Sequence, residues 1–346
     1  MKKLFVGINF KRGGFRGFAA QSGKGQNLKI GGVKDIIAVA SGKGGVGKST
    51  TAVNLAVSLA NKWQLKVGLL DADVYGPSIP MMMKLHGKPE VSADKKMIPI
   101  ENYGVRCMSM GSLVAEGDAL VWRGPMIMFY VISLVMKALE QMTRGVDWGT
   151  LDVLVVDMPP GTGDAQISIS QRLQLSGAVI VSTPQDVALM DARRGVKMFS
   201  QVNVPVYPLP SVTEFVFPQL SFIYFRQTYV LSIWLDKEFT HCIVFLDEII
   251  LGIVENMSYF KCPSCDEAHY IFGKGGAQKT ADEMGMRFLG ELPLETGIRS
   301  GSDEGVPVVI SNPESCVSRA YGDIAQKIVS TLELLNQPHS RPEINL

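Results

Sequence analysis

The chain has few cysteines and almost no net charge, and each shortage excludes a class of protein. Five cysteines among 346 residues, without the apolar h-region of a secretory signal, do not make a disulfide framework and indicate a reducing compartment. A formal net charge of +1 gives no general attraction to nucleic acid or to an anionic membrane, so we expect no nucleic-acid partner. Apolar residues make up 46 % of the chain, which is enough for the core of a globular protein.

Acidic residues are missing from the first 34 positions, which contain eight Lys or Arg. A basic, acid-poor leader of this kind is typical of an organellar transit peptide. The alternative is a solvated basic arm. We therefore expect residues 1–34 to be a targeting leader.

From Asp35 onward, short apolar runs alternate with longer helical patterns. This alternation predicts an α/β protein with a doubly wound, mostly parallel sheet, because continuous apolar runs fit strands that are buried on both faces. The expected strands are 36–40, 67–70, 151–156, 178–182 and 251–254. The expected helices are 49–61, 164–173, 186–200, 276–284 and 315–335.

Two segments depart from this alternation. Residues 207–250 contain 10 of the 28 aromatic residues and no glycine. Their apolar stretch 215–235 has the length of a membrane span, but Gln219 and Arg226 argue against one, and we expect no integral span. Residues 126–136 carry no charge and predict a buried helix.

A glycine-rich loop lies between the first expected strand and the first expected helix. Residues 42–50 read Gly-Lys-Gly-Gly-Val-Gly-Lys-Ser-Thr and fill every position of a Walker A motif in the strand-loop-helix context that the motif requires. The same residues satisfy the weaker dinucleotide pattern G-x-G-x-x-G. Lys48 and Ser49 directly after the last glycine favour a nucleoside triphosphate.

The residues of this loop have separate expected roles. Its backbone N–H groups would converge on phosphate oxygens at a helix N-terminus. Lys48 would lie on the β- and γ-phosphates, Ser49 would ligate Mg²⁺, and Thr50 would reach the α-phosphate. The expected nucleotide-binding residues of the loop are Gly42, Lys43, Gly44, Gly45, Val46, Gly47, Lys48, Ser49 and Thr50.

Two acidic clusters, at residues 70–78 and 156–164, follow expected strands, where ligands bind in open α/β sheets. Asp157 ends an apolar run as a Walker B aspartate does, so we expect it to hold a Mg²⁺-bound water. Gly161 would offer its N–H to the γ-phosphate. Asp71 is a candidate for supporting this site, and the alternative for any one of these aspartates is a helix cap or turn residue.

Cys262 and Cys265 form the one cysteine pair whose spacing points to a chemistry. They lie away from any expected strand-helix start, which disfavours a thioredoxin-type redox site. Two thiolates at this spacing half fill a metal centre, and a homodimer would supply four, enough for one [4Fe-4S] cluster. Zn²⁺ is the alternative, with His269 able to complete a mononuclear site, and inert thiols are a third possibility.

The loop at 42–50, the runs at 71–78, 157–164 and 182–186, and the C-P-x-C pair occur in the order found in the Mrp/ApbC family. The chain resembles these iron–sulfur cluster carrier ATPases of the ParA/MinD superfamily over about residues 30–335, and most of all the mitochondrial branch that delivers clusters to respiratory complex I. The resemblance implies a homodimer that uses ATP and Mg²⁺, hydrolyses ATP weakly, and passes a [4Fe-4S] cluster to apoproteins, complex I subunits among them, in the mitochondrial matrix. A plastid or the cytoplasm is the alternative location.

The resemblance also assigns roles to single residues. Lys43 would reach across the dimer interface to the partner's nucleotide, and Asp73 would orient the attacking water. Asn256 would contact the nucleotide, and Cys262 and Cys265 would hold the cluster. The expected catalytic residues are Lys43, Lys48, Asp73 and Asp157.

The family pattern predicts one ATPase domain at 35–335, with a cysteine-containing element at 258–270 and a polar tail at 336–346. Residues 129–136 and 207–250 are surplus to that pattern. They are typical of translated non-coding sequence, and a genuine insertion is the alternative. Two other functions exist in the superfamily and are the alternatives here. A MinD/ParA-like positioning ATPase would have a C-terminal basic amphipathic helix, whereas residues 336–346 are a mixed polar tail. An electron-transferring reductase like the nitrogenase iron protein would carry separated single cysteines and not a C-x-x-C pair.

Overall fold

The computed structural model describes six stretches of the chain: 30–73, 76–109, 137–201, 250–262, 264–265 and 267–336. Several predictions fall outside these stretches. They concern the leader up to residue 29, the helix at 126–136, the surplus segments at 129–136 and 207–249, and the tail from residue 337.

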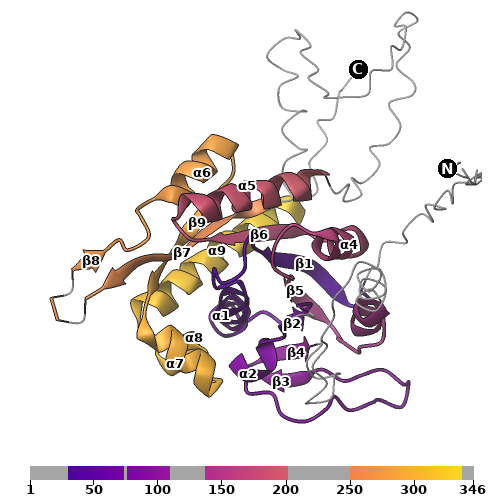
Figure 1. Ribbon diagram of the computed structural model, residues 1–346. Coiled ribbons are helices and arrows are strands. Elements are labelled where there is room, and N and C mark those ends of the chain that lie inside the picture. The colour runs from indigo at the N-terminus through magenta and orange to yellow at the C-terminus, as the bar shows by residue number, and fades with distance from the viewer. Residues whose placement is uncertain are drawn as a thin grey trace, which may run out of the picture.

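In the described residues, one sheet of nine strands forms the centre of the fold (Figure 1). Its order is β3-β4-β2-β5-β1-β6-β7-β8, and β9 also pairs with β7. Neighbouring strands run parallel except for the pairs β3–β4 and β7–β8, which confirms the mostly parallel sheet. The strands are β1 Val33–Ala40, β2 Val67–Asp71, β3 Ile100–Asn102, β4 Val105–Ser109, β5 Leu151–Asp157, β6 Gly177–Ser182, β7 Ile250–Lys261, β8 Ala268–His269 and β9 Phe288–Leu294.

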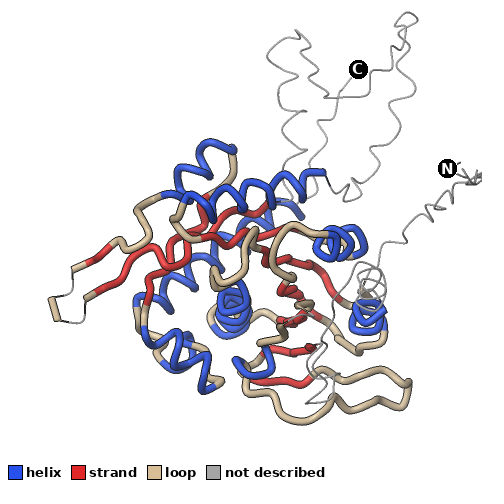
Figure 2. Tube along the Cα trace, in the orientation of Figure 1, coloured by secondary structure: helices blue, strands red, loops and turns tan. Residues whose placement is uncertain are grey.

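Helices cover both faces of the sheet, and Figure 2 shows the red strands running between them. One apolar core lies under α1, α2, α8 and α9, and a second lies under α4, α5, α6 and the helical residues 137–144. This is the doubly wound arrangement predicted from the sequence. The helices are α1 Lys48–Asn61, α2 Ile79–Met82, α4 Asp164–Arg172, α5 Asp186–Gln201, α6 Gly276–Met284, α7 Thr296–Glu304, α8 Val308–Ser311 and α9 Cys316–Asn336.

All five expected strands and all five expected helices are present. The strand predicted at 251–254 is too short, because β7 continues to Lys261. Its second half contains Glu255, Asn256 and Ser258, which interrupt the apolar run that marks a buried strand. All three side chains are buried and hydrogen-bonded in the fold.

The shorter elements β3, β4, β8, β9, α2, α7 and α8 were not expected from the sequence. Most of them are short or partly exposed, and such segments carry little periodic signal. Among the described residues, no helix has both the length and the apolar character to cross a bilayer.

Candidate nucleotide and metal sites

The predicted phosphate loop connects β1 to the N-terminus of α1. Gly47 precedes α1 with φ of 83°, and a Cβ atom there would lie 2.2 Å from Asn256 Nδ2. Only glycine fits such a position, because it combines a left-handed backbone with a close neighbour. Asn256 donates a hydrogen bond from Nδ2 to the Val46 carbonyl at 2.8 Å. The strand β7 therefore holds the loop directly.

Lys48 connects this loop to the acidic strand ends. It is only 6 % exposed, and its Nζ lies 2.5 Å from Asp157 Oδ1 and 3.8 Å from Asp73 Oδ2. It also donates to Ser49 Oγ at 3.1 Å. The fold thus brings Lys48, Ser49, Asp73 and Asp157 together from three separate parts of the sequence, as the motifs predict.

Asp71 and Asp157 end the neighbouring strands β2 and β5, and their Cα atoms are register partners. Both are fully buried. Asp71 Oδ2 accepts a hydrogen bond from the Ser109 hydroxyl at 2.8 Å, and its Oδ1 accepts one from the Asp73 N–H at 3.2 Å. Asp71 therefore holds the start of the loop that carries Asp73, which fits a supporting role.

Burial sets the protonation of these two carboxyl groups. It raises the pKa of Asp71 to about 7, with a further contribution from the Asp157 carboxylate, while the Ser109 hydroxyl acts in the opposite direction. Burial also raises the pKa of Asp157, and the Lys48 ammonium opposes that rise. Two adjacent buried carboxyl groups thus share a region in which added positive charge would be stabilising.

The residues present fit MgATP. Asp157 Oδ2 is buried and has no hydrogen-bond partner among the described residues, which leaves an acceptor for a Mg²⁺-bound water. Ser49 Oγ lies at the same place, within hydrogen-bonding distance of Lys48. The N-terminus of α1 adds backbone donors and a partial positive charge that favour phosphate.

Two other expected phosphate contacts have different partners in this structure. The Gly161 N–H donates to the Ser41 carbonyl at 3.0 Å, and Thr50 Oγ1 lies 3.8 Å from Met82 Sδ. Their contacts with phosphate stay predictions. Lys43 is exposed, and its expected contact with a partner's nucleotide also stays a prediction.

A cavity of about 140 Å³ lies beside the loop. Thr183 lines it, and Thr183 Oγ1 is buried without a hydrogen-bond partner among the described residues. None of the lining residues outside the loop was predicted as a site residue, although the family-like run at 182–186 was a signal for Thr183 and Gln185. The lining residues are Lys43, Gly44, Gly45, Val46, Thr183, Gln185, Ala188, Met257 and Phe272.

The cysteine pair lies at the tip of the hairpin formed by β7 and β8, which extends away from the helices (Figure 1). The Cys262 N–H donates to the Glu267 carbonyl at 2.9 Å and closes the hairpin. Cys262 is half-buried and Cys265 is exposed. Hydrogen bonds from the backbone of Ser264 and Cys265 lower the pKa of the Cys262 thiol, which favours the metal-binding thiolate.

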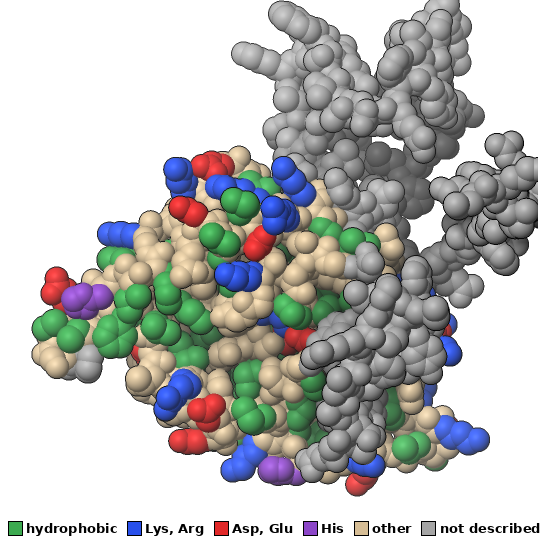
Figure 3. Space-filling model, viewed as in Figure 1, with side chains coloured by type: hydrophobic (Ala, Val, Ile, Leu, Met, Phe, Trp, Pro, Cys, Tyr) green, Lys and Arg blue, Asp and Glu red, His purple; other side chains and the backbone are tan. Residues whose placement is uncertain are grey.

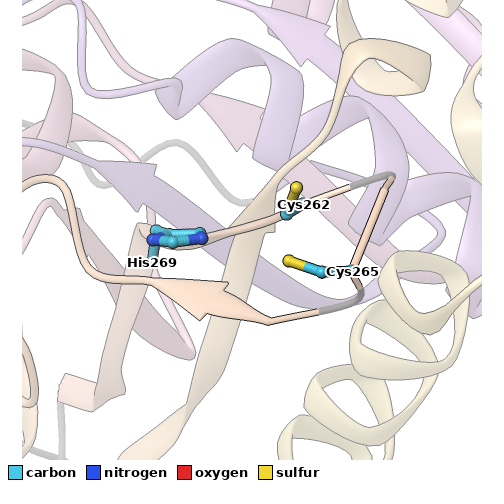
Figure 4. Close-up of side chains that lie close together, drawn as sticks. All are labelled: Cys262, Cys265 and His269. Atoms are coloured by element: carbon cyan, nitrogen blue, oxygen red, sulfur yellow. The ribbon is translucent and has the colours of Figure 1, made fainter.

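His269 joins this pair, as Figure 4 shows. The two sulfur atoms and a ring nitrogen of His269 all lie within 4.8 Å of one another. From the sequence, His269 was expected as a ligand only in the zinc alternative. The structure brings it to the cysteines because β8 pairs His269 with Phe260 on β7.

Comparison with known proteins shows which family the chain resembles. The family model described as "ParA: NUBPL iron-transfer P-loop NTPase" matches residues 32–214 and 237–329. The "Iron-sulfur protein required for NADH dehydrogenase, mitochondrial" of Arabidopsis thaliana is 56 % identical over 95 % of this chain and 88 % of its own. The "Iron-sulfur cluster transfer protein NUBPL" of Mus musculus is 50 % identical over 88 % of this chain and 79 % of its own.

Among solved structures, a nucleotide-binding protein of Archaeoglobus fulgidus in complex with ADP, with Co found in it, is 33 % identical. It superposes with a TM-score of 0.58 and covers 82 % of this chain and 90 % of its own. These matches confirm the resemblance stated from the motifs and the expected fold class. The chain belongs to the NUBPL family of iron-transfer P-loop NTPases.

Proposed function

We propose that this protein is an ATP-dependent carrier that binds a [4Fe-4S] cluster and transfers it to apoproteins, including subunits of mitochondrial NADH dehydrogenase. The names of the Arabidopsis and mouse relatives support both the cargo and the client. The name of the Arabidopsis relative supports a mitochondrial protein, and the basic leader supports the matrix as its location.

The observation that carries this proposal is the path of β7. At Asn256 this strand donates a hydrogen bond to the phosphate loop, and five residues later it ends at Lys261, directly before Cys262. The strand is irregular between these two points, where Met257 has a φ of 56° and the pairing of β7 with β9 shifts register. A change in the loop can therefore reach the metal-binding hairpin through one hydrogen bond and the backbone of β7.

In the nucleotide site, MgATP supplies the binding energy and the cleavable phosphoanhydride bond. The chain's own residues hold it: Lys48 and the loop amides would bind the phosphates, and Ser49 and Asp157 would hold Mg²⁺ and its water. Asp71 keeps the backbone of Asp73 in position through its hydrogen bond to the Asp73 N–H. Asp73 would then orient the attacking water.

We further propose that two copies of the chain form a homodimer through the face that carries the phosphate loop. Large apolar side chains are exposed beside the cavity, with Val187 60 %, Met190 52 % and Ile271 59 % exposed. Figure 3 shows hydrophobic side chains gathered on the face that bears the hairpin. Covering them with a second copy would bury Lys43 against the partner's nucleotide and bring two cysteine pairs together as four thiolates.

Anaerobic reconstitution with iron and sulfide tests the carrier function. The wild-type chain should take up one [4Fe-4S] cluster per dimer, and the double variant Cys262→Ala/Cys265→Ala should take up none. Cys316→Ala is the matched control and should behave like the wild type, since Cys316 starts α9 and lies outside the hairpin. Equal iron in wild type and double variant would overturn the proposal.

Transfer is measured next, with an apo iron–sulfur protein as acceptor. The rate of transfer should rise when MgATP is added to the loaded wild type and should not respond to MgATP in Lys48→Ala. A loaded wild type that transfers at the same rate with and without MgATP would contradict the ATP dependence.

The domain limits are part of the same proposal: one ATPase domain at 35–335, with residues 129–136 and 207–250 surplus to it. The family model leaves residues 215–236 unmatched, inside the longer segment. Sequencing the transcript across codons 200–256 tests this directly. A messenger RNA that retains these codons would show that the segment is a genuine insertion.

A further inference from the structure

We propose that a single subunit holds one divalent transition-metal ion through Cys262, Cys265 and His269, as an alternative to the cluster bridged between two subunits. This inference deepens the proposed function, on which it rests for the role of the cysteine pair. It adds His269 as a ligand and a mononuclear metal as a second occupant of the site.

The register of the hairpin places His269 next to Cys262. Phe260 lies opposite His269 in the antiparallel pair of β7 and β8. Side chains alternate along a strand, so Cys262, two residues after Phe260, lies on the same face of the hairpin as His269. Diagonal neighbours of this kind are within reach of each other's side chains. The proximity therefore follows from the strand pairing.

The distances are close to those of a metal site. Ligand bonds of about 2.0–2.3 Å in a tetrahedral zinc site put neighbouring ligand atoms roughly 3.3–3.8 Å apart. The three ligand atoms here already lie within 4.8 Å of one another. Closing the remaining distance of about 1 Å needs only small side-chain rotations, because Cys265 and His269 are exposed and not held by packing.

The donor set selects the class of metal. Two thiolates and one imidazole suit Zn²⁺, Co²⁺ or Fe²⁺ and do not suit Mg²⁺ or Ca²⁺, which take oxygen ligands. When the ion binds, each thiol loses its proton to solvent and the two thiolates neutralise the dication. Three protein ligands leave a fourth position open for water or an incoming ligand.

The two occupants exclude each other, because both need the same two thiolates. A subunit that holds Zn²⁺ cannot offer Cys262 and Cys265 to a bridged cluster. The mononuclear ion would thus keep subunits out of the cluster-bound dimer until it is removed.

Binding of Co²⁺ to the full-length, metal-free protein under anaerobic conditions tests this inference. The wild type should bind one Co²⁺ per chain, with the absorption of tetrahedral cobalt and thiolate-to-cobalt charge transfer. His269→Ala should bind Co²⁺ at least about 10-fold more weakly, since loss of even an outer partner of a metal ligand costs that much. The control His86→Ala changes a histidine remote in sequence from the hairpin and should match the wild type.

X-ray absorption on the cobalt should show sulfur and one imidazole in the wild type and no imidazole in His269→Ala. Equal affinity and equal spectra for these two proteins would overturn the inference. So would one cobalt per dimer held by four sulfur atoms.

Cluster uptake separates this inference from the proposed function. Wild type and His269→Ala should both take up a [4Fe-4S] cluster, and Zn²⁺-loaded wild type should do so only after chelation of the zinc. A wild type that binds Co²⁺ through His269 but takes up no cluster would refute the carrier function alone. A wild type that takes up the cluster equally well with Zn²⁺ bound would refute the exclusion.

Discussion

Replacing Asp71 with asparagine should make the stability of the nucleotide-free protein less dependent on pH. Burial and the neighbouring Asp157 raise the pKa of Asp71 from 3.8 to about 7. The folded protein therefore keeps the Asp71 proton up to about pH 7, whereas the unfolded chain releases it near pH 4. Unfolding in this range releases a proton, so the contribution of Asp71 is fully present below about pH 4 and is lost as pH rises through 7.

The magnitude follows from the size of the shift. One pKa unit corresponds to about 1.4 kcal/mol, so a shift of roughly three units is worth about 4 kcal/mol in the free energy of unfolding. Between pH 5 and pH 7 this single group should contribute a loss of about 2 kcal/mol in the wild type. The amide introduced by Asp71→Asn would be neutral at every pH and would not contribute to that loss. Its carbonyl oxygen could still accept the hydrogen bond from the Asp73 N–H.

The assay measures the free energy of unfolding of both proteins by denaturant titration between pH 5 and pH 8, with a metal chelator present and without nucleotide. The difference in unfolding free energy between Asp71→Asn and wild type should change by about 1.4 kcal/mol per pH unit in favour of the variant up to about pH 6, change less steeply around pH 7, and then level off. Asp303→Asn is the control, because Asp303 is exposed and its ion pair with Arg299 lies at the surface. Parallel pH profiles for wild type and Asp71→Asn would refute the reasoning, since Asp71 would then be ionised in the folded protein.

Three further changes test the geometry of the phosphate loop. Lys48→Ala should abolish MgATP binding in calorimetry, and unchanged binding would rule out Lys48 as a phosphate ligand. The same variant should be less stable by about 3 kcal/mol, because it leaves the buried Asp157 without its cation. Gly47→Ala should lower the unfolding free energy by about 1–3 kcal/mol, because residue 47 has a φ of 83° and the new Cβ would lie 2.2 Å from Asn256 Nδ2. A variant as stable as the wild type would contradict this packing. Asn256→Ala should lower the unfolding free energy by about 1–3 kcal/mol and weaken nucleotide binding, because the Val46 carbonyl loses its hydrogen-bond donor. Equal stability and equal nucleotide affinity, measured by unfolding and calorimetry, would show that this hydrogen bond does not hold the loop.

Consecutive residues were enough to predict the strand-loop-helix at residues 42–50. A glycine-rich loop between an apolar strand and a helix encodes its own backbone geometry, so Lys48 and Ser49 could be assigned from local sequence. Asp71 and Asp157 could be placed at strand ends for the same reason. The parallel sheet followed from the alternation of apolar runs and helices.

The second half of β7 could not be predicted in this way. Glu255 and Ser258 interrupt the apolar pattern, and a buried strand is recognised by that pattern. Their burial is possible because the Glu255 carboxylate accepts a hydrogen bond from the Ala277 N–H and one from the Ser258 hydroxyl. These partners come from α6 and from the strand itself, so only the assembled fold satisfies them.

The sequence by itself thus determined the phosphate loop, the acidic strand ends and the cysteine pair, because each is a local pattern whose chemistry depends on residues close together in the chain. The tertiary structure decided how these parts meet. Burial raises the pKa of Asp71, and strand pairing adds the neighbouring Asp157. The strand β7 joins Asn256 at the loop to Cys262 at the hairpin, and the β7–β8 register brings His269 to the cysteines. Such relations depend on distances between remote segments, which no local pattern of residues contains.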